Sequence, residues 1–305
     1  MTSKSALVAW IIFIGLAFTW GSSFILMKMG LQSFSGSQIG MIRIALAFWF
    51  TAIIGLRHFK KLNRKNAFPL AMVGLLGNGI PYTLFPLAIK HLDSSLVGIL
   101  NSLVPLFTLL SGVIWFGIRI RWMSIVGIIL GLLGAAGLLI PDISGNPGNL
   151  VYGIYPIIAT VCYALSINTI NSRLKDLGSF PITLLSLMFV GLPATVYVFT
   201  TDFVEIMQND PVAWKNLGYI ALLGIFGTSL AVILFNYLIK RSGSLFAASV
   251  TYFIPVIALF WGVVDGEDVG WLHFLGMLAI LGGVYLVNRR GSPADRIRKK
   301  FAGKA

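Results

Sequence analysis

Ten apolar runs, each about 20 residues long, constrain the fold of this chain more than any other feature of its sequence. About 20 mainly apolar residues are needed for one helix to cross a hydrocarbon core of roughly 30 Å. The chain is 57% hydrophobic and 11% charged, with a mean hydropathy of +0.88, which is not the composition of a soluble globular protein. We therefore predict an all-α polytopic membrane protein, with spans at 7–31, 38–56, 69–90, 94–117, 122–140, 150–171, 181–200, 214–239, 244–264 and 270–288. We interpret the first run as a span and not as a signal peptide, because no small-residue cleavage site follows it.

The charges predict how these spans are oriented. If the N-terminus is inside, all but four of the 23 Lys and Arg residues fall in cytoplasmic segments, the exceptions being Lys28, Arg43, Lys90 and Lys215. Translocated loops are depleted in Lys and Arg, so this bias predicts a cell (inner) membrane protein with both termini in the cytoplasm. The net charge of +13 then reflects topology and a basic tail over 291–305 that lies against anionic headgroups, so we expect no nucleic-acid partner.

An internal repeat divides the chain into two halves. Residues 74–113 recur about 150 residues later without a gap, and the register aligns Gly74 with Gly224, Lys90 with Lys240, Pro105 with Pro255 and Gly112 with Gly262. Five spans per half is an odd number, so the second half enters the membrane in the opposite orientation. We predict two inverted five-helix repeats, 1–145 and 146–290, around a central cavity, which is a transporter architecture.

Glycines recur at close-packing intervals in the fifth and tenth expected spans. They are Gly127, Gly131, Gly134 and Gly137 in the fifth, and Gly276, Gly282 and Gly283 in the tenth. Small residues let helix backbones approach closely in lipid. We favour packing within one chain, with a homodimer through these helices as the alternative.

The motifs along the ten spans resemble one family. The first span carries Thr19-Trp20-Gly21-Ser22-Ser23-Phe24, the second carries Arg43, and the sixth carries Cys162-Tyr163-Ala164-Leu165; Pro105, Pro255 and Gly266-Glu267 follow at matching places. This chain resembles the EamA-type ten-helix transporters of the drug/metabolite transporter superfamily. The acid that the resemblance leads one to expect at the end of the fourth span is replaced by Gly117.

The resemblance implies export or exchange of small metabolites, amino acids or their analogues by alternating access. It also implies that the first, third, fourth, sixth, eighth and ninth spans face a central cavity, and that the fifth and tenth are peripheral.

Polar side chains near the middle of a span are candidates for substrate binding, because an unpartnered polar group in hydrocarbon costs several kcal/mol. Ser and Thr often bond back to their own helix, and Asn often joins two helices, so each position has a structural alternative. The candidates are Ser23, Asn78, Asn101, Asn168, Ser229 and Thr251.

Aromatic residues within spans are a second group of candidates, since aromatic walls suit an amphipathic or aromatic ligand. Trp20 and Tyr163 lie too deep to be interfacial anchors, and they occupy equivalent positions of the first and sixth spans. Tyr82 and Tyr252 complete the group. These four residues favour an amino-acid-like substrate with an aromatic or hydrophobic side chain.

Two kinds of residue are expected to act in gating. Pro105 and Pro255 each remove a backbone hydrogen bond in mid-span and predict a hinge, with a static kink as the alternative. Arg43 lies near the outer end of its span, where its long side chain can reach the interface, so we expect it to act at the outer mouth. Lys28, Lys90 and Glu267 are expected to pair at the same mouth.

The central third of each span lacks Asp and Glu, which predicts transport without a buried carboxylate proton relay, as a uniporter or an exchanger. One cysteine and three scattered histidines predict neither a metal site nor a disulfide, and we expect no cofactor. A multidrug exporter, or an exporter of nucleosides or quaternary amines, remains open. A membrane enzyme is the more distant alternative, with Asp265, Glu267 and Asp268 as its one acidic cluster.

Overall fold

A computed structural model describes residues 3–116, 122–145 and 149–288 of the chain. The described residues are helical throughout, apart from the turns between helices. Eight helices are long and apolar enough to cross a membrane, and two shorter apolar helices cover 122–138 and 271–287. The prediction of a helical polytopic membrane protein with about ten spans is therefore confirmed. The basic tail over 291–305 and Gly117 lie outside the described residues.

The first five spans consist of helices that are broken at several points. Their elements are α1 (Ser3–Gly21), α2 (Ser23–Gly30), α3 (Gly36–Gly55), η1 (Leu56–Lys61), α4 (Arg64–Gly74), η2 (Leu75–Gly79), α5 (Ile80–Ile89), α6 (Ser94–Leu100), η3 (Asn101–Leu103), α7 (Val104–Phe116) and α8 (Trp122–Gly145).

The last five spans repeat this plan, with one extra short helix, α11, outside the spans. Their elements are α9 (Asn149–Arg173), α10 (Ser179–Phe199), α11 (Phe203–Asn209), α12 (Ala213–Gly224), η4 (Ile225–Leu230), α13 (Ala231–Ser242), α14 (Ser244–Ala248), η5 (Ser249–Tyr252), α15 (Ile254–Val264) and α16 (Trp271–Asn288).

The helix irregularities recur with the same 150-residue shift as the sequence. A π-helical turn lies at η2 in the third span and at η4 in the eighth, and a 3₁₀ turn lies at η3 in the fourth and at η5 in the ninth. Pro105 and Pro255 follow the two 3₁₀ turns as the second residues of α7 and α15. A proline has no N–H for the carbonyl four residues earlier, which is why the helix is tightened just before it.

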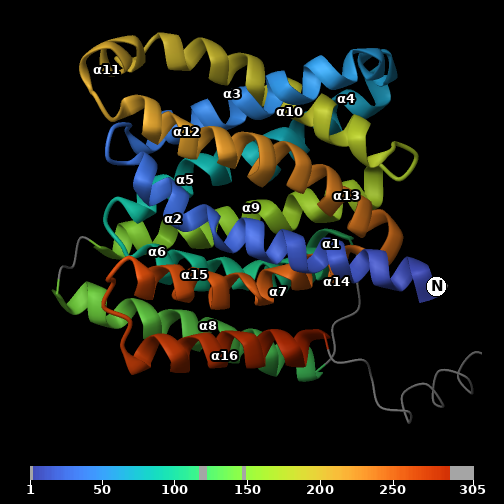
Figure 1. The fold of residues 1–305 in the computed structure, drawn as a ribbon. Helices are drawn as coiled ribbons and strands as arrows, with labels where there is room; N and C mark the ends of the chain where they lie inside the picture. Colours follow the sequence, from blue (N-terminus) through green and yellow to red (C-terminus); the bar gives the residue numbers. More distant parts are fainter. Residues whose placement is uncertain (1–2, 117–121, 146–148, 289–305) are drawn as a thin grey trace, which may run out of the picture.

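The spans form three groups in space (Figure 1). α3 and α10 pack together along one side of the bundle, α8 and α16 along the other, and the remaining spans lie between them. The chain crosses the bundle alternately, so α9 begins at the end opposite to that of α1 and runs in the opposite direction (Figure 1).

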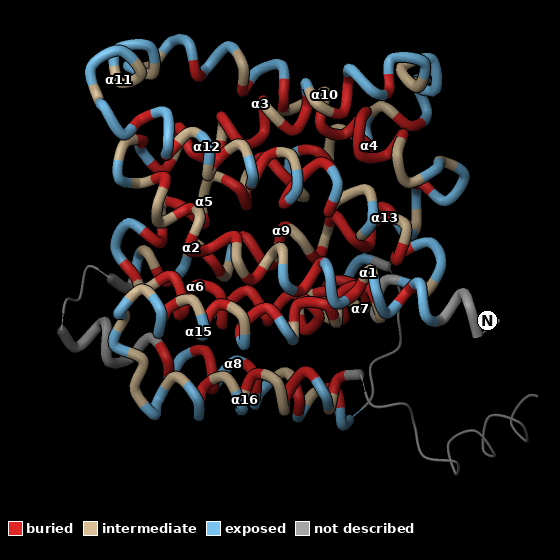
Figure 2. The backbone as a smooth tube through the Cα atoms, in the orientation of Figure 1, coloured by how far each residue is buried: buried red, intermediate tan, exposed pale blue. Residues whose placement is uncertain are grey.

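Large apolar side chains cover the outside of the bundle, while the central helices carry most of the buried residues (Figure 2). Ile53, Phe68 and Leu133 are 65–75% exposed on the outward faces of their helices. This pattern is the reverse of that of a soluble protein and fits a protein surrounded by lipid.

The glycines of α8 and α16 face each other within one chain. A Cβ atom at Gly127 would lie 2.3 Å from the carbonyl oxygen of Gly283, and a Cβ at Gly283 would lie 2.4 Å from that of Gly127. At Gly276 a Cβ would lie 2.2 Å from Cγ of Leu138. At Gly127, Gly276 and Gly283 the space beside the glycine is therefore filled within the chain, as expected for packing inside one chain.

Candidate functional site: a central cavity

A cavity lies in the middle of the bundle and includes about 790 Å³ of space that protein atoms do not occupy, counting its opening. Residues of seven spans line it, namely the first four, the sixth, the eighth and the ninth, while α8 and α16 contribute none. The six spans implied by the resemblance thus face the cavity, and the second span adds Arg43.

Seven of the ten residues predicted to bind substrate line this cavity. They are Trp20, Ser23, Asn78, Tyr82, Asn101, Tyr163 and Thr251. Two of these hydroxyls bond back to their own helix, because Ser23 donates to the carbonyl of Thr19 over 2.9 Å and Thr251 to that of Ala248 over 2.8 Å. Their oxygens keep free lone pairs, so they can still accept a hydrogen bond from a ligand.

Three predicted residues lie elsewhere. Asn168 donates to the carbonyl of Thr108 over 2.8 Å and to Oγ of Ser111 over 2.9 Å, and so joins the sixth span to the fourth. Ser229 donates to the carbonyl of Ala47 over 2.7 Å and joins the eighth span to the second. The side chain of Tyr252 does not line the cavity and packs against the main apolar cluster of the bundle.

Sequence reasoning missed several lining residues that a helical periodicity could have revealed. Phe24 and Met27 follow Trp20 at four and seven residues, and therefore lie on the same face of the first span. Phe85 follows Asn78 at seven residues, and Ser166 follows Tyr163 at three. Asn236 was missed because it lies only one turn from the basic end of its span, at Lys240.

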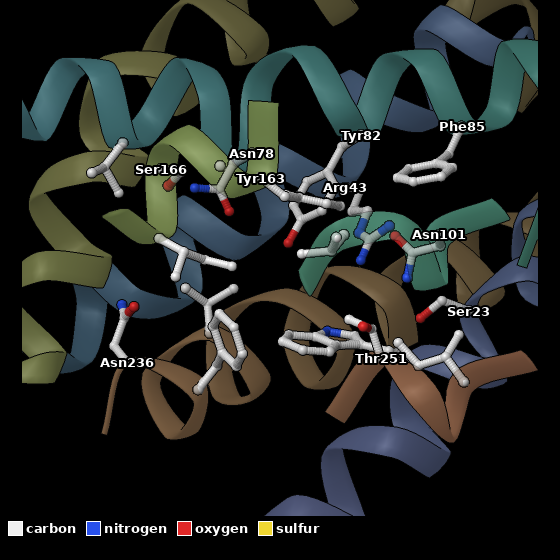
Figure 3. Close-up of a pocket in the computed structure, with 18 of the residues that line it drawn as sticks. Ser23, Arg43, Asn78, Tyr82, Phe85, Asn101, Tyr163, Ser166, Asn236 and Thr251 are labelled. Atoms are coloured by element: carbon white, nitrogen blue, oxygen red, sulfur yellow. The ribbon is translucent and has the colours of Figure 1, made fainter. Parts of the chain in front are cut away.

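Three asparagine side chains line the cavity with unused hydrogen-bonding capacity (Figure 3). Asn78 is 1% exposed, Asn101 5% and Asn236 1%, and Oδ1 of each has no hydrogen-bond partner among the described residues. Buried polar atoms are nearly always paired, so an unpaired one in a cavity marks a place where a ligand or water can bind. Asn78 lies in the π-helical turn η2, and such turns are frequent at functional sites.

Aromatic rings form the walls around these polar groups. The ring of Tyr163 stacks on that of Phe85 with centroids 5.9 Å apart, and meets Tyr82 edge-on at 6.4 Å. On the opposite wall Trp20 meets Phe235 edge-on at 5.0 Å, and its Nε1 donates to the carbonyl of Gly227 over 2.9 Å. The cavity therefore combines rigid apolar walls with a few polar groups, as sites for amphipathic molecules do.

The structure corrects the prediction for Arg43. Its side chain does not reach the interface; it is 3% exposed and turns inward to line the cavity. Nε donates to Oγ1 of Thr228 over 2.8 Å, and the guanidinium carbon lies 3.8 Å above the centroid of the Tyr82 ring. These contacts with the π-helical turn η4 and with α5 hold the charge in the bundle, and the sequence of α3 alone does not show them.

The end of the bundle that carries most acidic residues contains a charged cluster. Nζ of Lys28 lies 2.8 Å from Oε1 of Glu267 and 2.5 Å from Oδ2 of Asp265. The Glu267 carboxylate also accepts from the hydroxyl of Ser94 over 2.7 Å, and from the backbone N–H groups of Ser94 and Ser95 over 3.0 Å each. The expected pairing of Lys28 with Glu267 is thus present, while the side chain of Lys90 is exposed.

Burial alone would raise the pKa of the Glu267 carboxyl, but the hydrogen bonds from Lys28, Ser94 and Ser95 outweigh it and lower the pKa to about 2. The side chain of Glu267 is only 2% exposed although it belongs to a loop. The cluster therefore stays ionised across the physiological range and ties the first span, the fourth span and the loop before α16 together.

The cavity extends toward the opposite, basic end of the bundle. Ile170 and Asn236 line it one turn before Arg173 and Lys240, which mark that end. On the acidic side Phe24 and Met27 lie between the cavity and the Lys28 cluster, and are 5% and 1% exposed.

Few side chains in the described part of the chain are arranged for catalysis or metal binding. No group of three or more His, Cys, Asp or Glu side chains is placed there to hold a metal ion. Cys162 is buried, and the acidic side chains Asp265 and Glu267 are engaged with Lys28.

Ten spans around a central, mainly apolar cavity with a few polar groups are an architecture that polytopic membrane transporters use. The sequence pattern of the EamA-like transporter family matches residues 7–140 and again residues 151–289, so the chain belongs to this family.

Several relatives align with nearly the whole chain. An uncharacterized transporter of Archaeoglobus fulgidus is 25% identical over 92% of this chain and 99% of its own. The uncharacterized inner membrane transporter YedA of Escherichia coli K12 is 26% identical over 88% of this chain and 86% of its own. A protein of Streptantibioticus cattleyicolor described as a probable terminal-alkyne amino-acid exporter is 23% identical over 89% of this chain and 90% of its own. A solved crystal structure, 16% identical, matches the fold over 92% of this chain with a TM-score of 0.62.

Proposed function

We propose that this protein exports small metabolites, namely amino acids or related compounds and preferentially those with an aromatic or hydrophobic side chain, by alternating access through the central cavity. The observation that carries the proposal is the cavity itself, in which aromatic walls surround one guanidinium and three amide oxygens that have no partner among the described residues. An amino acid needs these two environments, a polar one for its charged α-amino and α-carboxylate groups and an apolar one for its side chain. The amino-acid exporter among the relatives supports the same substrate class.

The alternative substrates fit the cavity less well. A quaternary amine is a permanent cation, and it would enter a cavity that contains Arg43 and, among the described lining residues, neither Asp nor Glu. Like charges in a low-dielectric site repel strongly. A nucleoside carries no charge at neutral pH and would leave the Arg43 guanidinium without a counter-ion. We therefore place amino acids before multidrug, nucleoside or quaternary-amine export.

The distribution of charges supports a proposed orientation in the membrane and a proposed mode of coupling. The basic end of the bundle is proposed to face the cytoplasm, so the cavity reaches toward the cytoplasm and the Lys28–Glu267 cluster closes the outer side. Without a carboxylate among the described lining residues, the cavity offers no obvious proton relay. We therefore propose uniport or exchange, with bending at Pro105 and Pro255 accompanying the switch between the two faces.

An export screen tests the proposal. Host cells with and without the protein are challenged with p-fluorophenylalanine, a toxic nucleoside analogue and a toxic quaternary amine. We expect expression to protect against the amino-acid analogue alone, and Tyr163→Ala to abolish that protection. Tyr285→Ala is the matched control, because Tyr285 is 63% exposed on the outside of the bundle. Protection against the amine or the nucleoside alone would refute the proposed substrate class.

A liposome assay tests the coupling. Purified protein in vesicles preloaded with phenylalanine should exchange it for external labelled phenylalanine at equal pH on both sides. Strict dependence on an imposed pH gradient would contradict transport without a proton relay.

A further inference from the structure

Arg43 presents more hydrogen-bond donors to the cavity than the protein uses. An arginine side chain carries five N–H donors. Nε donates to Oγ1 of Thr228 over 2.8 Å, Nη2 donates to the carbonyl of Gly227 over 3.3 Å, and Nη1 reaches only Sδ of Met27 at 3.9 Å. Two N–H groups are therefore left without a partner in the part of the chain that the structure describes.

The cavity around Arg43 has no acidic side chain among its described lining residues. The Arg43 side chain is 3% exposed in the middle of a bundle of apolar helices. No carboxylate of the described lining therefore faces its charge. The Tyr82 ring at 3.8 Å compensates part of the charge, but a buried charge generally needs a partner of opposite sign.

We propose that Arg43 is the anion site of the cavity and binds the carboxylate of the transported molecule. This inference rests on the proposed function and deepens it, because it names the group by which the substrate is held. A planar guanidinium matches a carboxylate through two parallel N–H bonds, and the free N–H groups of Arg43 provide them.

Asn78 and Asn101 supply a preference for the positively charged end of the substrate. Oδ1 of Asn78 and Oδ1 of Asn101 are buried acceptors without donors, and both side chains point into the pocket that Arg43 enters (Figure 3). An ammonium group carries only donors, so these oxygens suit it. Together the three residues select a zwitterion and discriminate against an amine that has no carboxylate.

The protein holds the guanidinium in place before a ligand arrives. Tyr82 stacks against its face, and the π-helical turn η4 offers the hydroxyl of Thr228 and the carbonyl of Gly227 to its edge. A fixed fork loses little entropy when a carboxylate binds, whereas a lysine at this position would be a mobile point charge. Arg43→Lys should therefore retain part of the anion preference and Arg43→Gln none of it.

The test compares two probes of the same shape, benzoate and benzamide, which differ in charge. Thermal unfolding of the purified full-length protein in detergent is measured against the concentration of each, for the wild type, Arg43→Gln, Arg43→Lys and Lys28→Gln. Ligands that bind the folded state raise the unfolding temperature by an amount that grows with the logarithm of one plus the ratio of the ligand concentration to Kd. Lys28→Gln is the matched control, since it removes a cation that is outside the cavity lining.

We expect benzoate to stabilise the wild type and Lys28→Gln at concentrations at which benzamide does not. In Arg43→Gln the dissociation constant for benzoate should rise about 30-fold or more, which is the lower end of the effect of removing one partner of a buried charge pair. Equal effects of benzoate and benzamide on the wild type, or a benzoate preference that survives in Arg43→Gln, would overturn the inference.

A second measurement keeps the test decisive if Arg43→Gln does not fold. Ser23 lines the same cavity, so Ser23→Cys in a Cys162→Ala background provides a thiol beside the proposed site. Benzoate should slow its alkylation several-fold more than benzamide does, and equal protection by both would refute the anion site. A benzoate preference without any export of p-fluorophenylalanine would refute the proposed function and leave the anion site standing.

Discussion

Replacing Glu267 by Gln tests whether a single loop carboxylate stabilises the acidic end of the bundle. Gln keeps the size of the side chain, and its carbonyl oxygen can still accept from a backbone N–H of Ser94 or Ser95. The substitution therefore removes mainly the charge that faces Lys28, at 2.8 Å, and leaves Lys28 with Asp265 alone.

The size of the effect follows from the pKa of the carboxyl group. The folded protein lowers it from 4.5 to about 2. Each pKa unit corresponds to about 1.4 kcal/mol, so the ionised form is favoured by about 3 kcal/mol. Lys28, the partner of Glu267, has a side chain that is 36% exposed, so solvent screening reduces this to about 2 kcal/mol. We expect Glu267→Gln to unfold about 4 °C below the wild type.

Thermal unfolding of the purified protein, followed by the loss of its monodisperse peak in size-exclusion chromatography, measures this difference. Asp268→Asn is the matched control, because it removes a charge from the adjacent, exposed residue of the same loop. If both variants unfold at the same temperature, the hydrogen bonds of Glu267 do not stabilise the bundle and the reasoning fails.

The lowered pKa of Glu267 also predicts how the stability of the protein depends on pH. Its folded-state pKa is depressed, so its contribution to stability is complete above about 4.5 and is lost as the pH falls from there toward about 2. Between about pH 5 and pH 8 the Lys28–Glu267 pair should therefore leave the unfolding temperature unchanged.

Three further predictions concern the packing, the hinge and the topology. Gly127→Ala should destabilise the protein by about 1–3 kcal/mol, since its Cβ would lie 2.3 Å from the carbonyl oxygen of Gly283. Gly137 has open space around it, so Gly137→Ala should leave the stability unchanged, and the unfolding temperatures of the two variants test the difference. Pro105→Ala restores an N–H donor after η3, so it should slow counterflow in vesicles while leaving substrate affinity unchanged, and a full rate would argue against a hinge. A cysteine at exposed Gln208 in α11 should react with an impermeant maleimide from outside whole cells, and one at exposed Lys60 only after lysis; the reverse result would invert the topology.

The sequence predicted the helical spans and much of the cavity because both depend on local patterns. The length of an apolar run defines a span in a membrane. Trp20, Asn78, Asn101 and Tyr163 are predictable as site residues because polar and deeply placed aromatic side chains in the middle of a span are unusual and often functional. The broken helices at η3 and η5 were foreseeable from Pro105 and Pro255.

What the sequence could not give was the rotation of each helix and the partners of each polar group. Asn101 and Asn168 look equivalent in the sequence, yet one faces the cavity without a partner and the other is paired with Thr108 and Ser111. Arg43 was expected at the interface because snorkelling needs only a long side chain, whereas its inward position depends on Tyr82 and η4, which lie far away in sequence.

The two halves of the chain share a backbone frame but differ in the side chains that face the cavity. The paired irregular turns, η2 with η4 and η3 with η5, give both halves the same frame around the cavity. The side chains placed on that frame differ, because the 150-residue shift aligns Asn78 with Thr228 and Asn101 with Thr251. In this structure Asn78 and Asn101 keep free acceptor oxygens, while Thr228 accepts from Arg43 and Thr251 bonds to its own helix.

Arg43 marks the sharpest departure from the symmetry. The shift of 143 residues that aligns Trp20 with Tyr163 aligns Arg43 with Ser186, an uncharged residue whose hydroxyl is bonded to the carbonyl of Thr183 over 3.1 Å. A two-fold frame can open toward either side of a membrane by the same motion, since its two halves are equivalent. A substrate with distinct ends, however, needs a site that is not symmetric, and one guanidinium in one half supplies that difference.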